Sequence, residues 1–182
     1  MDRCKVLHAS IGEHFRALRQ CVEWLSIKSQ VALNQSNKAI DLFYGLGNFT
    51  LPMAKYAKYV IGVKGDSGLI ERSNDNTQKN AINNVDFYRA DLFKEVAGFE
   101  WFRGKHYNKA LIDPDRSGAI EIVELLPKLG VERLVYVSCN SAALARNTAK
   151  LITPGYQLET AGVMDMSPQT AHVESIELFV KC

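Results

Sequence analysis

A cysteine that closes an apolar run is the clearest chemical feature of this sequence. The run RLVYVSCN (133–140) has the composition of a buried strand, and SAALARNTAK, which follows at once, has the pattern of a helix. Cys139 is therefore expected at the carboxyl end of a strand and beside a helix amino terminus, where open α/β sheets hold their ligands and where the helix dipole lowers the pKa of a thiol. This context favours a nucleophile. The alternative is an inert buried thiol, because cysteine is among the most buried residue types.

A cysteine nucleophile needs a second group that handles protons. The segment AHVESIELF supplies His172 and Glu174 directly before the last apolar run of the chain. Glu174 is the candidate base, and the alternative is an exposed residue at the start of a strand.

Two further acids follow apolar runs. Asp113 ends the fourth run in LIDPDRSG, where Pro114 stops the strand and stiffens the turn, so a site acid is favoured over a turn-forming residue. Asp91 follows the third run and is placed to meet the amino group of an adenine, with an ordinary surface aspartate as the equal alternative. Arg116 suits either a phosphate contact or an ion pair with Asp115.

A glycine-containing loop, DLFYGLGNFT, follows the first apolar run and opens a helix. Gly45 and Gly47 allow the backbone to turn tightly and approach a ligand, and Asn48 and Thr50 are suited to cap the helix. The loop departs from the G-x-G-x-x-G pattern that binds a pyrophosphate, because residue 50 is threonine and Phe49 crowds the approach. It therefore favours S-adenosylmethionine, which has no phosphate, over a nicotinamide dinucleotide.

The second apolar run ends in IGVKGD, where an acid that binds ribose hydroxyls is expected. Lys64 holds that position, and its ammonium group can donate a hydrogen bond but not accept one. Asp66 lies two residues further on and would replace the acid only if the loop bends.

Seven apolar runs and the helical patterns between them define the expected fold. Strands separated by helices predict a parallel sheet, and the absence of a helix pattern between the last two runs predicts an antiparallel pair. The sequence therefore predicts an α/β, Rossmann-like domain with a seven-stranded, mostly parallel sheet whose last strand is antiparallel, as in class I S-adenosylmethionine-dependent methyltransferases. The expected strands are 38–43, 59–64, 85–90, 109–113, 133–139, 156–164 and 175–181, and the expected helices are 13–25, 48–57, 67–82, 92–102, 117–128 and 140–151.

Length and composition suit one globular domain of 182 residues, with 47% hydrophobic and 23% charged residues. Residues 1–37 are expected to form a leading helix and a connecting loop, and residues 38–182 the catalytic domain. No apolar run is long enough to span a membrane and the first residues lack a signal-peptide core, so a cytoplasmic location is expected. The four cysteines form no C-x-x-C pair, so no metal site is predicted.

Taken together, these segments resemble the RNA uracil-5-methyltransferases, and most closely the branch that methylates 23S ribosomal RNA. The resemblance covers most of residues 13–182. It rests on separate blocks in the family's order: DLFYGLGNFTLPMA, IGVKG, LIDPDRSG, LVYVSCNSAALARN and HVESIELF.

The resemblance implies a covalent mechanism. The Cys139 thiolate would add to carbon 6 of uracil, carbon 5 would take the methyl group of S-adenosylmethionine, and Glu174 would remove the carbon 5 proton. The target base would have to leave any stack to reach the thiol. The expected RNA partner is 23S ribosomal RNA, with transfer RNA as the alternative. The expected S-adenosylmethionine contacts are Phe43, Gly45, Asn48, Lys64, Asp91 and Asp113.

The chain departs from the family at two of these blocks. Lys64 replaces the glutamate that binds ribose in the family, and Asp115 stands where the family usually has proline or alanine. The chain is expected to hold the catalytic domain without the family's RNA-binding and central domains. Two alternatives remain: a non-catalytic fragment whose cofactor binding is impaired at Lys64, and a nicotinamide dehydrogenase, which offers no role for the Cys139 and Glu174 pair.

Overall fold

The computed structural model describes residues 33–45, 47, 49–164 and 174–182. The expected leading helix at 13–25, together with Asn48 and His172, lies outside the described residues.

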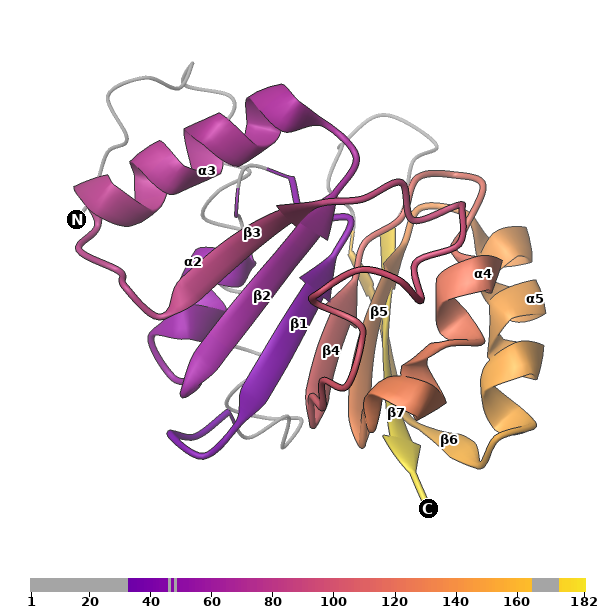
Figure 1. Ribbon diagram of the computed structural model, residues 1–182. Coiled ribbons are helices and arrows are strands. Elements are labelled where there is room, and N and C mark those ends of the chain that lie inside the picture. The colour runs from indigo at the N-terminus through magenta and orange to yellow at the C-terminus, as the bar shows by residue number, and fades with distance from the viewer. Residues whose placement is uncertain (1–32, 46, 48, 165–173) are drawn as a thin grey trace.

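The described residues form one seven-stranded sheet (Figure 1). Its strand order is β3-β2-β1-β4-β5-β7-β6, and β7 runs antiparallel to both of its neighbours while the other pairs are parallel. The predicted mostly parallel sheet with an antiparallel last strand is thereby confirmed. The strands are β1 (Lys38–Leu42), β2 (Tyr59–Lys64), β3 (Val85–Arg89), β4 (Lys109–Ile112), β5 (Arg133–Ser138), β6 (Tyr156–Met164) and β7 (Glu174–Lys181).

Helices α2 and α3 accompany the β1–β3 half of the sheet, and α4 and α5 accompany the β4–β5 half (Figure 1). The bounds are α2 (Thr50–Ala54), α3 (Ser67–Lys79), α4 (Ile120–Val123), the 3-10 helix η1 (Leu126–Leu129) and α5 (Ser141–Ile152). Each falls within a predicted helical segment or extends it by one residue, but the predicted helix at 117–128 is divided into α4 and η1.

The helix predicted at 92–102 is wrong. The segment instead makes successive turns, in which the backbone N–H groups of Lys94, Phe99 and Phe102 each donate to the carbonyl three residues earlier. Gly98 lies in the middle of the segment, and glycine costs about 1 kcal/mol relative to alanine inside a helix. The apolar side chains that suggested a helix are buried all the same, since Val96 and Trp101 are both 0% exposed.

Two apolar clusters cover the two faces of the sheet, as the alternation of strand side chains requires. Ala39, Val60 and Leu111 point to the face covered by α2, where Phe49 and Met53 meet them. The neighbouring strand residues Ile40, Ile61 and Leu134 point to the opposite face. There they belong to one apolar cluster with Ile122 of α4, Leu126 of η1 and Trp101 of the 92–102 segment.

The connections of the sheet define one edge for ligands. From β1 the chain goes outward to β2 and β3, then crosses back to β4 on the other side of β1. In open α/β sheets, ligands bind beyond the carboxyl ends of the strands at such a switch point. Because β7 is antiparallel to β5, its amino end reaches the same edge, where Ser138 pairs with Ser175.

Gly62 in β2 leaves the space that two aromatic rings occupy. A Cβ atom at this position would lie 2.6 Å from Cδ1 of Phe87 and 3.0 Å from Cδ1 of Tyr44. We expect Gly62→Ala to lower the free energy of unfolding by about 1–3 kcal/mol, the usual cost of overpacking a core, as measured by urea denaturation. Gly98→Ala is the control, because its Cβ would meet nothing within 4 Å. Equal stability of the two variants would contradict this account.

Candidate active site

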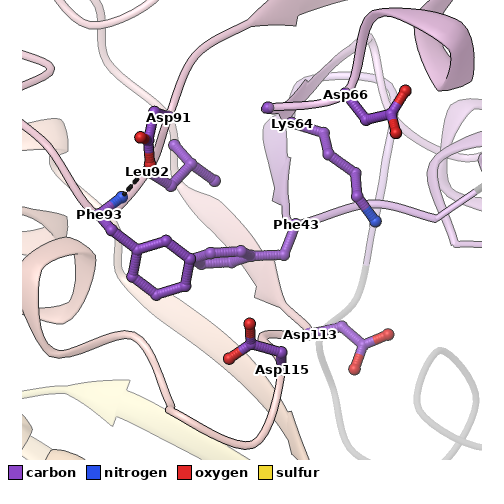
Figure 2. Close-up of a pocket in the computed structure, with 9 residues that line it drawn as sticks. Phe43, Lys64, Asp66, Asp91, Leu92, Phe93, Asp113 and Asp115 are labelled. Atoms are coloured by element: carbon purple, nitrogen blue, oxygen red, sulfur yellow. Dashed lines mark hydrogen bonds between the residues drawn. The ribbon is translucent and has the colours of Figure 1, made fainter.

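A cleft of about 210 Å³ opens at the carboxyl edge of the sheet. It is lined by Phe43, Lys64, Gly65, Asp66, Asp91, Leu92, Phe93, Asp113 and Asp115 (Figure 2). These residues follow or end the four strands β1 to β4, so segments far apart in the sequence form one surface. Two aromatic rings beside several carboxylates suit a ligand that combines a flat ring with hydroxyl or amino groups.

Phe43 adopts an unusual backbone conformation at the centre of the cleft. Its φ of 66° is in the left-handed region, which costs a residue with a Cβ about 1–3 kcal/mol. Its N–H still donates to the carbonyl of Val63 at 3.0 Å, so the turn stays attached to the sheet. The ring lies 5.5 Å from the ring of Phe93, which is 42% exposed (Figure 2). The pair thus offers an aromatic surface against which a flat ring can stack.

Asp41 is a fully buried acid beneath the glycine-containing loop. The Thr50 hydroxyl donates to its Oδ2 at 2.5 Å, and its Oδ1 has no hydrogen-bond partner among the described residues. Burial raises the pKa of Asp41 to about 7, with the Thr50 hydrogen bond opposing the shift, Asp113 adding to it and Lys64 opposing it. The Lys64 ammonium is therefore close enough to stabilise this carboxylate.

Asp113 lines the cleft and is also influenced by the charge of Glu174 at the start of β7. Its N–H donates to the carbonyl of Leu42 at 3.2 Å, which fixes the start of the turn against β1. Burial raises the pKa of the half-buried Asp113 to about 7, the charge of Glu174 raises it further, and Lys64 opposes the shift. The charges of Lys64, which lines the cleft, and of Glu174, at the start of β7, thus both act on the same carboxyl group.

Asp91 and Asp115 are held in their charged forms by local hydrogen bonds. Lys94 at 3.0 Å and the N–H of Phe93 at 3.1 Å lower the pKa of Asp91. The hydroxyl and the N–H of Ser117 do the same for Asp115. The cleft is therefore predominantly acidic at neutral pH, with the ammonium of Lys64 as the opposing charge.

Cys139 and Glu174 are neighbours across the junction of β5 and β7. The last register pair of this ladder is Ser138 with Ser175, and the Ser175 hydroxyl donates to the Ser138 carbonyl at 3.2 Å. Cys139 directly follows Ser138, and Glu174 directly precedes Ser175. Adjacent strands lie about 4.7–4.9 Å apart, so the two residues begin from backbones one strand spacing apart.

The thiol of Cys139 is exposed, in contrast to the buried thiol that the sequence left as the alternative. It lies directly before Asn140, the N-cap of α5, whose side-chain oxygen accepts from the N–H groups of Ala142 at 3.0 Å and Ala143 at 3.3 Å. The predicted position between a strand end and a helix amino terminus is therefore observed.

The structure brings most of the candidate residues to this edge. Phe43, Lys64, Asp91 and Asp113 line the cleft, and Gly45 lies half-buried in the loop after β1. The sequence interpretation missed Phe93 and Asp41. An acid inside the apolar run KAIDLF was a signal for Asp41, because buried carboxyl groups are rare.

Within the described part of the chain, no helix is long and apolar enough to cross a membrane. The same residues contain no cluster of three or more His, Cys, Asp or Glu arranged to hold a metal ion.

The strand order and the cleft at the switch point define the class I S-adenosylmethionine-dependent methyltransferase fold. Magnesium protoporphyrin IX methyltransferase from Synechocystis shares this fold with a TM-score of 0.69 at 18% identity, over 95% of this chain and 82% of that one. A higher identity, 25%, relates the chain to the tRNA (uracil-54, C5)-methyltransferase of Pyrococcus abyssi, with a TM-score of 0.72 over 92% of this chain and 38% of that one.

The chain belongs to the tRNA (uracil-5-)-methyltransferase family, whose model matches residues 16–181. It is 76% identical over 149 residues to the 23S rRNA (uracil(1939)-C(5))-methyltransferase RlmD of Vesicomyosocius okutanii, covering 82% of this chain and 34% of that protein. It is 47% identical over 167 residues to RlmD of Francisella tularensis, covering 91% and 36%. The chain therefore spans about a third of the length of these relatives.

The raised pKa of Asp113 predicts how its replacement changes stability with pH. Its pKa is about 7 in the folded protein against 3.8 for an ordinary aspartate, so between these values the folded state binds more protons and the free energy of unfolding falls as pH rises. We expect Asp113→Asn to be more stable than the wild type by about 1–3 kcal/mol at about pH 8, with the difference shrinking towards about pH 4.

Urea denaturation at a series of pH values measures this effect. Asp75→Asn, at an exposed position of α3, is the matched control and should show no such trend. A stabilisation by Asp113→Asn that stays constant with pH would show that the folded protein does not hold Asp113 in an unfavourable charged state.

Proposed function

We propose that this chain is a catalytic domain that methylates carbon 5 of uracil in RNA, with S-adenosylmethionine as methyl donor. Family membership supports the reaction class. The observation that carries the proposal is the ladder between β5 and β7, which ends at Ser138 and Ser175 and so sets Cys139 beside Glu174 at the edge that holds the cleft.

The cleft fits the proposed donor. Phe43 and Phe93 provide an aromatic surface for adenine, and Asp91 offers carboxylate oxygens beside it. Gly45 and Asn48 in the loop after β1, together with Lys64 and Asp113, complete the proposed binding residues. The acidic lining suits the positively charged sulfonium of S-adenosylmethionine. When bound, the donor supplies the electrophilic methyl carbon that carbon 5 of the base takes up.

Cys139 and Glu174 have the two protein roles in the proposed reaction. The Cys139 Sγ, as thiolate, forms a bond to carbon 6 of uracil, which moves electron density to carbon 5 and makes it nucleophilic. After carbon 5 has gained the methyl group, a Glu174 carboxylate oxygen takes the carbon 5 proton. The electron pair of that C–H bond restores the ring double bond, and the bond between Cys139 and carbon 6 breaks. The residue is released as a thiolate, ready for the next base.

The proposed substrate is 23S ribosomal RNA, because the relatives of 76% and 47% identity carry that activity in their names. The alternative is transfer RNA, which is named in the family description and in the Pyrococcus abyssi structure. A target uracil would have to leave its stack to reach the exposed thiol. Ribosomal RNA as substrate agrees with the cytoplasmic location expected from the sequence.

A second candidate function is a folded domain with impaired donor binding. The observation that favours it is Lys64, whose ammonium lies in the cleft where a ribose-binding acid is expected. In this case the acidic groups nearby would hold Lys64 as their counter-ion, and the ribose hydroxyls would lack an acceptor.

Trapping with 5-fluorouracil tests the proposed mechanism directly. A fluorine at carbon 5 cannot leave as a proton does, so RNA that contains the analogue should form a stable covalent adduct with the chain when S-adenosylmethionine is present. We expect a shifted band on a denaturing gel for the wild type, no band for Cys139→Ala, and trapping but no turnover on normal RNA for Glu174→Gln. Cys182→Ala, at the exposed carboxyl end, is the control for nonspecific thiol reaction.

The result that would contradict the mechanism is an adduct that survives in Cys139→Ala, or none with the wild type on either RNA. Separate reactions with 23S ribosomal RNA and with transfer RNA decide between the two substrates.

Replacement of Lys64 tests the second candidate. If the lysine weakens donor binding, Lys64→Glu should bind S-adenosylhomocysteine about tenfold to hundredfold more tightly than the wild type, because a charged acceptor for the ribose adds about 1.5–3 kcal/mol. Isothermal titration calorimetry measures the affinity. Lys64→Gln removes the charge without adding an acid and should lie between the two. Weaker binding by Lys64→Glu than by the wild type would show that the lysine itself contributes to binding.

A further inference from the structure

Two turns border the proposed site, and hydrogen bonds join them. The first is the 115–118 turn, which follows Asp113 at the end of β4. The second consists of Cys139 and Asn140, between β5 and α5. The first turn begins two residues after Asp113, a proposed donor contact, and the second carries the proposed nucleophile.

The side-chain amide of Asn140 both accepts and donates hydrogen bonds. Its Oδ1 accepts from the backbone of Ala142 and Ala143 and so caps α5. Its Nδ2 donates to the carbonyl of Arg116 at 2.9 Å, across 24 positions of sequence. The cap needs only the oxygen, so the second hydrogen bond serves to attach the 115–118 turn to the residue after Cys139.

Arg146 makes a parallel connection from α5, six residues after Asn140. Its guanidinium donates to the carbonyl of Ser117 at 2.7 Å and to Oδ1 of Asn147 at 3.2 Å. Asn147 is 0% exposed and donates to the hydroxyl of Tyr136 in β5 at 2.7 Å. The 115–118 turn is thereby connected through α5 to the strand that ends at the nucleophile.

Gly118 is shaped for this contact. Its φ is +82°, and a Cβ there would lie 2.9 Å from a guanidinium nitrogen of Arg146 and 2.9 Å from Nδ2 of Asn147. The turn therefore packs directly on the side chains that hold it. Arg146 itself is exposed, so it is not needed to fill the core.

We propose that Arg146 and Asn140 are positioning residues that fix the distance between the methyl donor and the nucleophile. The hydrogen bonds from Asn140 to Arg116 and from Arg146 to Ser117 form what we call the inter-loop clamp. The proposal rests on the function proposed above and extends it: neither residue touches donor or base, and each acts by holding the Asp113 turn against the Cys139 turn. Methyl transfer depends on this spacing because a displacement of about 1 Å between reacting groups can lower a rate about a hundredfold.

Three variants separate the clamp from simple folding. Arg146→Met keeps the aliphatic stem but removes all donors. Asn140→Asp keeps the oxygen that caps α5 and loses the donor to Arg116. Arg146→Lys restores a donor but not the forked geometry that reaches Ser117 and Asn147 together. Arg72→Met, at an exposed position of α3, is the matched control.

The readouts are measured on the full chain. Unmodified 23S ribosomal RNA with tritium-labelled S-adenosylmethionine gives kcat and KM, calorimetry gives the affinity for S-adenosylhomocysteine, and alkylation by iodoacetamide reports the accessibility of Cys139. We expect Arg146→Met and Asn140→Asp to lower kcat at least tenfold, while the affinity and the alkylation rate each change less than threefold. Arg146→Lys should recover part of kcat. The double variant with Arg146→Met and Asn140→Asp should lower kcat by less than the product of the two single fold-losses, because both residues act on one turn.

A fall in kcat that matches an equal loss of donor affinity, or that follows the unfolded fraction at the assay temperature, would overturn the proposal. So would strictly multiplicative losses in the double variant.

If the wild type transfers no methyl group, the proposed function fails. Amide hydrogen exchange then tests separately whether the clamp holds the two turns together. Arg146→Met should then speed exchange in peptides covering both 115–118 and 139–143, with the rest of the sheet unchanged. Unchanged exchange in either peptide would overturn the clamp.

Discussion

The antiparallel addition of β7 to β5 is the interaction on which the site depends. In a wholly parallel sheet, a strand following β6 would bring its carboxyl end to the ligand edge, and the residues before it would lie at the opposite edge. Here the reversed strand brings its first residue, Glu174, to the edge where β5 delivers Cys139. The spacing is enforced by backbone hydrogen bonds along the ladder from Arg133 and Val180 to Ser138 and Ser175. A slip of one residue would move Glu174 to the other face of the sheet.

The same edge gathers more negative charge than a buried surface usually tolerates. Asp41 and Asp113 both have a pKa raised to about 7, chiefly because burial disfavours their charged forms. The ammonium of Lys64 opposes both shifts, so it acts as an internal counter-ion as well as part of the cleft wall. A positively charged donor would have the same effect on these carboxylates. Lys64 and a bound donor would therefore act on the same two carboxyl groups.

Sequence patterns predicted every strand end to within one residue, because each strand is an apolar run stopped by a polar or turn-forming residue. They failed at 92–102, where apolar spacing resembled a helix but a glycine and several aromatic residues gave consecutive turns around Trp101. Cys139, Glu174 and Asp113 could be proposed as site residues from sequence because each adjoins a strand end. Local sequence could not show the influence of the Lys64 charge on Asp41, or the contact of Phe93 with Phe43, since both depend on how β1, β2 and β3 lie together.

The links between Asn140 and Arg116 and between Arg146 and Ser117 were beyond prediction for the same reason, because they join residues 24 and 29 positions apart. Because of these hydrogen bonds, loops without regular secondary structure at this edge still hold fixed positions relative to one another. Strand ends fix where each loop begins, but a side chain several bonds from the sheet can still lie in several places. Hydrogen bonds from one loop to the backbone of the next remove that freedom at low cost, because a carbonyl in a tight turn is already ordered. In the proposed reaction, precision at the reacting atoms would therefore come from contacts between loops as well as from the sheet beneath them.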